Sequence, residues 1–239
     1  MNDIFLPEPM KSLLGNIEKK ALINIYGAPG TGKTNLCLLA AVECIKNGGK
    51  VVYIDTEGGF SLERLKQLTP DYQPILDKIE LVEPRNLAEQ GNVIKKLENT
   101  DADLIILDSS VALYRLEYSD GKNEIIDETK KVCMPANKVL DANRELSKQL
   151  SELSFIARQK DISVIITAHA FKPWNGESLD MVGGDMMKYW SKTIVHIEKT
   201  NKMSERKATI LKHRYMPEGK TMKFVLTSDG IKPVGFKLF

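Results

Sequence analysis

The chain has 239 residues, of which 42% are hydrophobic, 28% charged and 7% aromatic. This length and composition predict a globular protein with a sizeable core and exclude disordered, collagen-like and low-complexity chains. No apolar run is long enough for a signal-peptide core or a membrane span, so we expect a soluble cytoplasmic protein without a membrane partner.

The distribution of charge points to a polyanion as a ligand. The net charge is only +2, but residues 188–239 contain 12 of the 34 Lys and Arg residues and 4 of the 32 Asp and Glu residues. This segment therefore carries +8 and the rest of the chain −6. Polyanion binding explains such asymmetry, and a lysine-rich solvated strand face is the alternative. Cys37 and Cys44 lie about 10 Å apart on one predicted helix and only Cys133 accompanies them, which excludes a disulfide framework and a cysteine zinc site.

The first half of the chain alternates short apolar strands with helices. Strands are predicted at 22–26, 51–55, 79–82 and 103–108. Helices are predicted at 33–47 and 86–98. Asn86 and Glu89 form a variant of the capping box at the start of the second helix.

The second half changes character after Trp190. A helix at 134–160 and a strand at 162–167 continue the alternation, and three short antiparallel strands joined by polar turns follow. These strands are predicted at 193–198, 207–214 and 221–227. The order predicts an α/β fold in a single domain over 1–239, with a mostly parallel sheet flanked by helices and a C-terminal antiparallel β-hairpin extension. Residues 1–20 are expected to be an N-terminal extension.

A phosphate-binding loop (P-loop) lies between the first strand and the first helix. Residues 27–34 fit G-x-x-x-x-G-K-[ST], in which glycines turn backbone N–H groups toward phosphates, Lys33 supplies a point charge and Thr34 a Mg²⁺ ligand. The candidate nucleotide-binding residues are Gly27, Ala28, Pro29, Gly30, Thr31, Gly32, Lys33, Thr34 and Asn35.

Carboxylates at the ends of two predicted strands supply the other groups that nucleotide hydrolysis requires. Asp108 ends one strand, where a carboxylate completes the magnesium site; capping of a turn is the alternative. Glu57 follows the strand that ends at Asp55 and is predicted to orient the attacking water, with Asp55 as the competitor.

Four segments resemble the RecA-like strand-exchange recombinases of archaea and eukaryotes. They are 53–65, 107–119, 183–194 and 212–219. The resemblance covers nearly the whole chain and points to archaeal paralogues of the main recombinase, because the chain starts almost at the ATPase core and no helix-hairpin-helix domain is expected before it. It implies a RecA-like P-loop ATPase core that binds ATP and Mg²⁺, associates with the nucleoid, and acts in homologous recombination and DNA repair as an accessory with weak ATPase activity.

The resemblance also implies roles for single residues. Glu57 would be the base that activates water, and Arg64 would stack on adenine; a solvent-facing helix arginine paired with a carboxylate is the alternative. Lys212 and Arg214, expected on one strand face, would act with Lys33 in catalysis by reaching the nucleotide of a neighbouring subunit. A solvated face of an edge strand is the alternative for this pair.

His169 departs from the recombinase pattern. These proteins usually carry Thr-Asn-Gln where this chain has Thr-Ala-His at 167–169, and the glutamine senses the γ-phosphate and signals to a DNA-binding loop. The imidazole of His169 is a candidate phosphate or water ligand whose donor pattern depends on tautomer and charge. A simple buried or capping histidine is the alternative.

DNA contacts are expected in two loops and near the C-terminus. One loop follows Arg115; the other, 170–184, places basic residues beside aromatic ones such as Phe171. Packing of Trp174 against the domain is an alternative, and the acidic run 124–128 opposes attraction in the first loop. Lys199 belongs to the basic C-terminal footprint. The candidate DNA contacts are Arg115, Lys122, Lys172, Trp174, Lys202, Arg206 and Lys207.

The implied partners are single- or double-stranded DNA, RadA recombinase and the resolvase Hjc, with a homo-oligomer if Lys212 and Arg214 act between subunits. Two other functions compete with this one. They are a nucleotide-gated protein-binding module with negligible hydrolysis and a KaiC-like signalling ATPase. The segment 114–119 favours the recombinase side.

Overall fold

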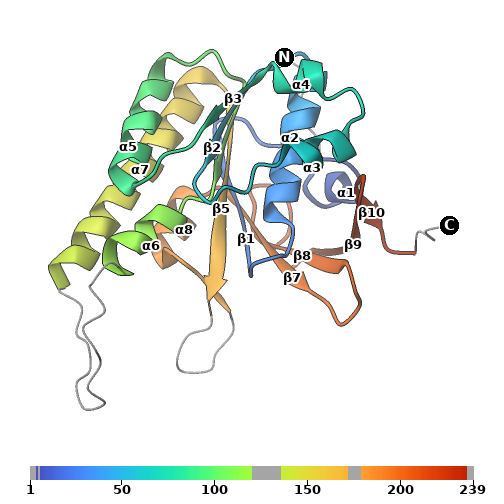
Figure 1. Cartoon of the computed structure of the whole chain (residues 1–239). Helices are drawn as coiled ribbons and strands as arrows, with labels where there is room; N and C mark the ends of the chain where they lie inside the picture. The colour runs from blue at the N-terminus through green and yellow to red at the C-terminus, as the bar shows by residue number, and fades with distance from the viewer. Residues whose placement is uncertain (1–3, 5, 120–135, 172–178, 236–239) are drawn as a thin grey trace.

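A computed structural model describes residues 4, 6–119, 136–171 and 179–235 (Figure 1). Its strands are β1 (Ala21–Gly27), β2 (Val51–Asp55), β3 (Ile79–Val82), β4 (Leu104–Asp108), β5 (Ser163–Phe171), β6 (Asp180–Met181), β7 (Thr193–Lys199), β8 (Glu205–Lys212), β9 (Thr221–Thr227) and β10 (Gly230–Pro233). Its α-helices are α1 (Met10–Leu14), α2 (Lys33–Lys46), α3 (Leu62–Leu68), α4 (Gln73–Leu76), α5 (Leu87–Lys96), α6 (Ala112–Ser119), α7 (Ala136–Lys160) and α8 (Gly184–Trp190). A 3₁₀ turn over Leu97–Asn99 extends α5.

One sheet joins these strands in the order β10-β9-β8-β7-β1-β5-β4-β2-β3, and β6 pairs with the end of β5. The strands from β7 to β3 run parallel to their neighbours. The strands from β7 to β10 pair antiparallel. The predicted α/β fold with a mostly parallel sheet and a C-terminal antiparallel extension is therefore confirmed, and β1, which leads into the P-loop, lies between β5 and β7.

Helices cover both faces of the sheet (Figure 1). The core on one face contains residues of α1 to α4, and the core on the other contains residues of α5 to α8. Successive side chains of β1 point to opposite faces of the sheet. Ile23 and Ile25 therefore belong to the first core, and Leu22 and Tyr26 belong to the second. The result is a three-layer arrangement in which the central strands β1, β2 and β4 are buried on both faces.

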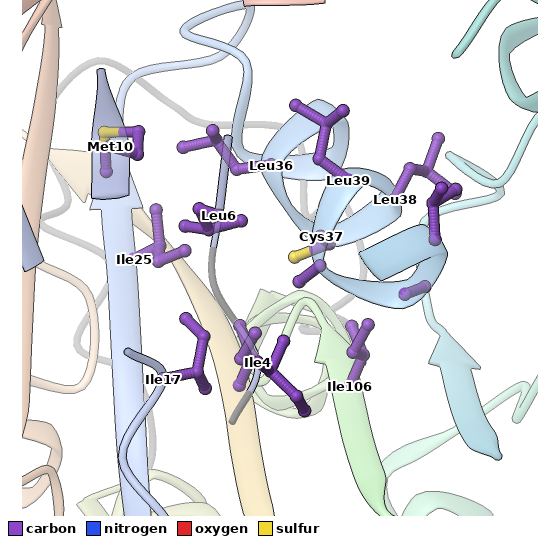
Figure 2. Packing of buried hydrophobic residues seen from close by; sticks show 14 of the residues in the cluster. Ile4, Leu6, Met10, Ile17, Ile25, Leu36, Cys37, Leu38, Leu39 and Ile106 are labelled. Carbon is purple, nitrogen blue, oxygen red and sulfur yellow. The ribbon is translucent and has the colours of Figure 1, made fainter. Parts of the chain in front are cut away.

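The N-terminal residues are part of the core. Ile4, Leu6 and Ile17 are almost fully buried, and they pack with Leu36 and other residues of α2 (Figure 2). Because α2 begins at the P-loop, these contacts also fix the helix that carries the candidate nucleotide site. The segment expected as an extension therefore contributes to the support of that site.

The C-terminal strands differ from the prediction at one point that matters for function. The predicted strand 207–214 is β8, which ends at Lys212 after starting at Glu205. Arg214 therefore lies beyond the strand, and the expectation that Lys212 and Arg214 share one strand face is wrong. The chain turns toward β9 directly after Lys212, so the strand geometry that would place the two side chains on one face does not extend to Arg214. Among the described residues, no helix combines the length and the apolar character that crossing a membrane requires.

Candidate functional site

The P-loop follows β1 at the end of the sheet where the parallel strands terminate. Gly30 and Gly32 have φ angles of 71° and 99°, in the left-handed region that favours glycine. Gly27 is required for another reason, since a Cβ atom there would lie 2.2 Å from the carbonyl oxygen of Ile197 on β7. The spacing of the motif thus reflects both loop geometry and close strand packing.

Lys33 lies at the start of α2 and folds back over the loop. Its Nζ donates hydrogen bonds to the carbonyl oxygens of Gly27 and Ala28, at 3.0 and 3.2 Å. Burial lowers the pKa of Lys33, while the nearby charges of Glu57 and Asp108 act in the opposite direction. The ammonium group is thus held at the loop with two carboxylates near it.

Asp108 ends β4 and is 5% exposed. One carboxylate oxygen accepts a hydrogen bond from the hydroxyl of Tyr53 at 2.9 Å, and the other accepts one from the hydroxyl of Thr167 at 2.5 Å. These bonds come from the neighbouring strands β2 and β5. They fix the orientation of the carboxylate where it faces the P-loop.

Glu57 has different contacts on its two oxygens. Oε1 accepts a hydrogen bond from the Ser109 hydroxyl and lies 2.6 Å from Nε2 of His169. Oε2 has no hydrogen-bond partner in the described part of the chain. The bond with His169 is the main cause that lowers the pKa of Glu57, with Ser109 and Lys33 contributing and burial opposing. Glu57 is therefore an oriented carboxylate with one oxygen available.

Asp55, the competing candidate for the base, has a structural role. Its carboxylate accepts backbone hydrogen bonds from Glu57, Gly59 and Phe60 at 3.0, 3.2 and 2.8 Å. A carboxylate that caps a loop with three such bonds is occupied. Asp55 thus shapes the loop that presents Glu57.

Arg64 uses all five of its N–H donors. Nε and Nη2 donate to Oδ1 of Asn35, and Nη1 donates to the side-chain oxygen of Gln67. The remaining two bonds reach the carbonyl oxygens of Thr227 and Ser228, at 2.9 and 2.6 Å. Burial lowers the pKa of Arg64. The arginine therefore ties α2 and α3 to the turn after β9, and it is not the carboxylate-paired surface residue of the alternative interpretation.

One cavity of about 450 Å³ brings these groups together. Such a volume is within the range of small-ligand sites. Its lining includes Pro29, Gly30, Gly32, Lys33, Thr34, Asn35, Glu57, Gly59, Ser61, Arg64, Asp108, His169 and Leu226. Sequence reasoning did not identify Leu226, whose side chain lies 3.0 Å from the position of a Cβ atom on Gly32.

The predicted trans-acting pair lies away from this cavity. Lys212 is paired in register with Ile194 near the start of β7, and its Nζ donates to the carbonyl oxygen of Lys188 at 2.7 Å. Arg214 is exposed. Neither residue lines the nucleotide cavity of its own chain, so any role there requires a second copy.

The predicted DNA contacts are found in two places. Arg115 and the exposed Phe171 line a separate pocket of about 570 Å³ between α6 and the end of β5. Lys202 and Lys207 belong to the β7–β8 hairpin, where they form ion pairs with Glu205 and Glu198 at 3.9 and 2.9 Å. Arg206 instead donates from Nη2 to the carbonyl oxygen of Gly30 at 3.0 Å. The candidates that lie outside the described residues are Lys122, Lys172 and Trp174.

Comparisons with known proteins agree with this architecture. The Rad51 family model matches residues 8–234. A protein described as DNA repair and recombination protein RadB from Methanococcus maripaludis is 42% identical over 224 residues, covering 92% of this chain and 94% of its own length. The protein of that name from Methanocaldococcus jannaschii is 38% identical, with coverage of 92% and 96%. A solved structure described as the RadB recombinase aligns with a TM-score of 0.75 and 30% identity, covering 95% of this chain and 97% of that one.

Proposed function

The chain belongs to the Rad51 family, among proteins of the RadB type that act in DNA repair and recombination, and from this premise we propose that it is an ATP-dependent DNA-binding recombinase paralogue with weak ATPase activity. The observation that carries the proposal is the cavity in which Lys33, Asp108 and Glu57 meet beside the P-loop. The similarity to repair proteins along more than nine-tenths of the chain favours this function over KaiC-like signalling.

The residues of the cavity fit a nucleoside triphosphate with Mg²⁺. The P-loop provides backbone N–H groups and Lys33 for the phosphates, and Thr34 and Asp108 for the ion. Nδ2 of Asn35 is buried and has no hydrogen-bond partner among the residues that the structure describes, while its Oδ1 is held by Arg64, so a polar donor remains for a ligand at this wall. The ion, when bound, neutralises the charge that develops on the phosphates.

Glu57 is the residue proposed to take a proton from the attacking water. Its Oε2 is the available oxygen, and the two bonds to Oε1 hold the carboxylate in one orientation. The lowered pKa keeps Glu57 ionised at neutral pH but makes it a weaker base. A slow hydrolytic step follows from this arrangement.

His169 is proposed to link the nucleotide cavity to the DNA-binding surface. It lies on β5 with its ring against Glu57, and two residues later the same strand reaches Phe171 beside Arg115. A change at Glu57 is therefore transmitted along a single strand. The β7–β8 hairpin, with Lys202 and Lys207, is the second proposed DNA contact.

Further partners are proposed from the family resemblance. RadA recombinase and the resolvase Hjc are the protein partners. A homo-oligomer would allow Lys212 and Arg214 of one copy to approach the nucleotide of the next, because both lie outside the cavity of their own chain.

A nucleotide-gated module with negligible hydrolysis is the second candidate function. Both hydrogen bonds to Glu57 converge on Oε1, and they oppose the movement of the carboxylate toward a water molecule. If these two hydrogen bonds persist when nucleotide binds, the protein would hydrolyse little ATP. ATP binding would then control which partner proteins it binds.

The test is ATP hydrolysis by the purified chain with and without single-stranded DNA. We expect slow hydrolysis that DNA stimulates, lost in Glu57→Gln with ATP binding retained, and loss of ATP binding in a folded Lys33→Ala variant. Tight ATP binding with turnover that neither DNA nor Glu57→Gln changes would favour the gated module. Normal ATP binding by folded Lys33→Ala would contradict the P-loop assignment.

A further inference from the structure

The β7–β8 hairpin contacts the P-loop through Arg206. Nη2 of Arg206 donates to the carbonyl oxygen of Gly30 at 3.0 Å, and Nη1 donates to the carbonyl oxygen of Glu205 on its own strand at 2.9 Å. In the described part of the chain, Nε is buried without a hydrogen-bond partner, and burial lowers the pKa of the guanidinium. The guanidinium of Arg206 is thus partly shielded from water, and it contacts the P-loop that follows β1.

A second cation, Lys199, accompanies Arg206. Lys199 lies directly opposite Arg206 in the β7–β8 register, and its Nζ is 3.3 Å from the position of a Cβ atom on Gly30. Like charges opposite each other destabilise a strand pair. Within the described ranges neither residue has an ion pair, because Glu198 and Glu205 are paired with other lysines. This unbalanced pair of positive charges requires an explanation.

The orientation of the loop carbonyls supplies one. The carbonyl oxygens of Gly27 and Ala28 accept bonds from residues of the loop and helix start, Lys33 and Thr31. Gly30 differs, because its carbonyl is held from outside by Arg206. A P-loop binds phosphate when its N–H groups point inward, which requires its carbonyls to point outward.

We propose that Arg206 is a positioning residue of the nucleotide site, and that the Lys199–Arg206 pair supplies positive charge for the triphosphate group of a nucleotide bound in the P-loop. This inference rests on the proposed function. It assigns Arg206, a candidate DNA contact from the sequence, to the nucleotide phosphates. Arg206 holds the Gly30 peptide in the binding orientation, and both cations raise the potential where the phosphates sit.

The experiment measures equilibrium binding of ATP and AMP by calorimetry to the full chain and to variants with one charge removed. We expect Arg206→Gln to weaken ATP binding roughly tenfold, as the loss of a charge-assisted bond does, and to change AMP binding little. Arg206→Lys should recover part of the loss, because the charge remains without the planar fork. Lys199→Met should weaken ATP binding by a smaller factor.

Lys223→Ala is the matched control. It removes one positive charge from the adjacent strand β9, where Lys223 approaches Glu205 at 3.9 Å and does not contact the loop. Its ATP affinity should equal that of the wild type. Thermal unfolding of each variant excludes loss of fold as a cause, and Lys199→Met, at the strand surface, serves if Arg206→Gln does not fold.

The possible outcomes distinguish a failure of this inference from a failure of the proposed ATP-binding function. Wild-type ATP affinity in folded Arg206 and Lys199 variants, with Lys33→Ala still defective, overturns the inference alone. If those variants instead lose affinity for single-stranded DNA, the pair contacts nucleic acid and the inference is again overturned. Failure of the wild type to bind ATP overturns the proposed function and this inference with it.

Discussion

Glu57 is the residue on which the pH response of the site depends. Its pKa is lowered from the ordinary 4.5, chiefly by the bond with His169. The unfolded chain therefore binds this proton at a higher pH than the folded chain, so the stabilising contribution is complete above about pH 4.5 and is lost as pH falls through the folded pKa. The glutamate is 38% exposed, which keeps the contribution modest.

We therefore expect Glu57→Gln to make thermal stability less dependent on pH. Below about pH 4.5 the melting temperature of the wild type should fall more steeply than that of the variant. The measurement is thermal unfolding by circular dichroism from pH 6 to pH 3. The control is Glu63→Gln, which changes an exposed glutamate in the first turn of α3. Parallel curves for wild type and Glu57→Gln would show that the bond to His169 does not persist in solution.

Residue types and spacing predicted three candidate site residues that the structure brings together. Lys33, Asp108 and Glu57 are marked by a motif or by the end of a strand, and all three line one cavity. Arg64 shows where such reasoning stops. Two of its partners are carbonyl oxygens of Thr227 and Ser228, and a backbone carbonyl leaves no trace in the sequence.

At the scale of elements, the strength of the apolar pattern decides what the sequence predicts. The strongly apolar strands β1, β2 and β4 and the long helices α2 and α7 match the predicted positions, because each has a periodic pattern of its own. The helices α3 and α4 were not predicted, because four to seven residues are too few for a repeated apolar stripe on a helix. The strand β10 was not predicted either, because only two of its four residues are buried. Each of the three elements also packs on the core, through Leu65 of α3, Ile75 of α4 and Ile231 of β10.

The contact between β1 and β7 gives a prediction at this scale. Gly27→Ala places a Cβ atom 2.2 Å from the carbonyl oxygen of Ile197, so the two strands must separate. We expect a loss of about 3 kcal/mol in the free energy of unfolding, as for overpacking in a core. Urea unfolding measures it.

Gly59→Ala is the matched control for that measurement. Its added Cβ would be 3.5 Å from Thr34, an ordinary contact, so we expect a change of less than about 1 kcal/mol. Equal stability of the two variants would mean that β1 and β7 are not in close contact at Gly27 and Ile197 in solution.

At the scale of the whole molecule, the strongest feature is the excess of positive charge after residue 188. The structure shows that some of these lysines are exposed and that others are paired with glutamates. Lys202 has a 77% exposed side chain and only a distant partner in Glu205. Lys207 is partly neutralised by Glu198 at 2.9 Å. Sequence alone counts both as one charge each, because ion pairs within the β7–β8 hairpin depend on its register.

Binding of single-stranded DNA should therefore depend on salt, and unequally on these two lysines. We expect Lys202→Ala to reduce the slope of log affinity against log salt by about 0.7, and Lys207→Ala to reduce it by less. Fluorescence anisotropy with a labelled oligonucleotide at several salt concentrations measures both slopes, with Lys20→Ala, in the turn immediately before β1, as the control. A flat response in the wild type would exclude the hairpin as a DNA contact.

The position of β1 in the sheet has a consequence for how the protein is made. The P-loop is synthesised early, but residues that pack against it are synthesised late. Ile197 lies beside Gly27, and Leu226 packs over Gly32. A nascent chain that has not yet reached Leu226 contains the complete motif without the complete cavity. The complete cavity is thus acquired only near the end of translation.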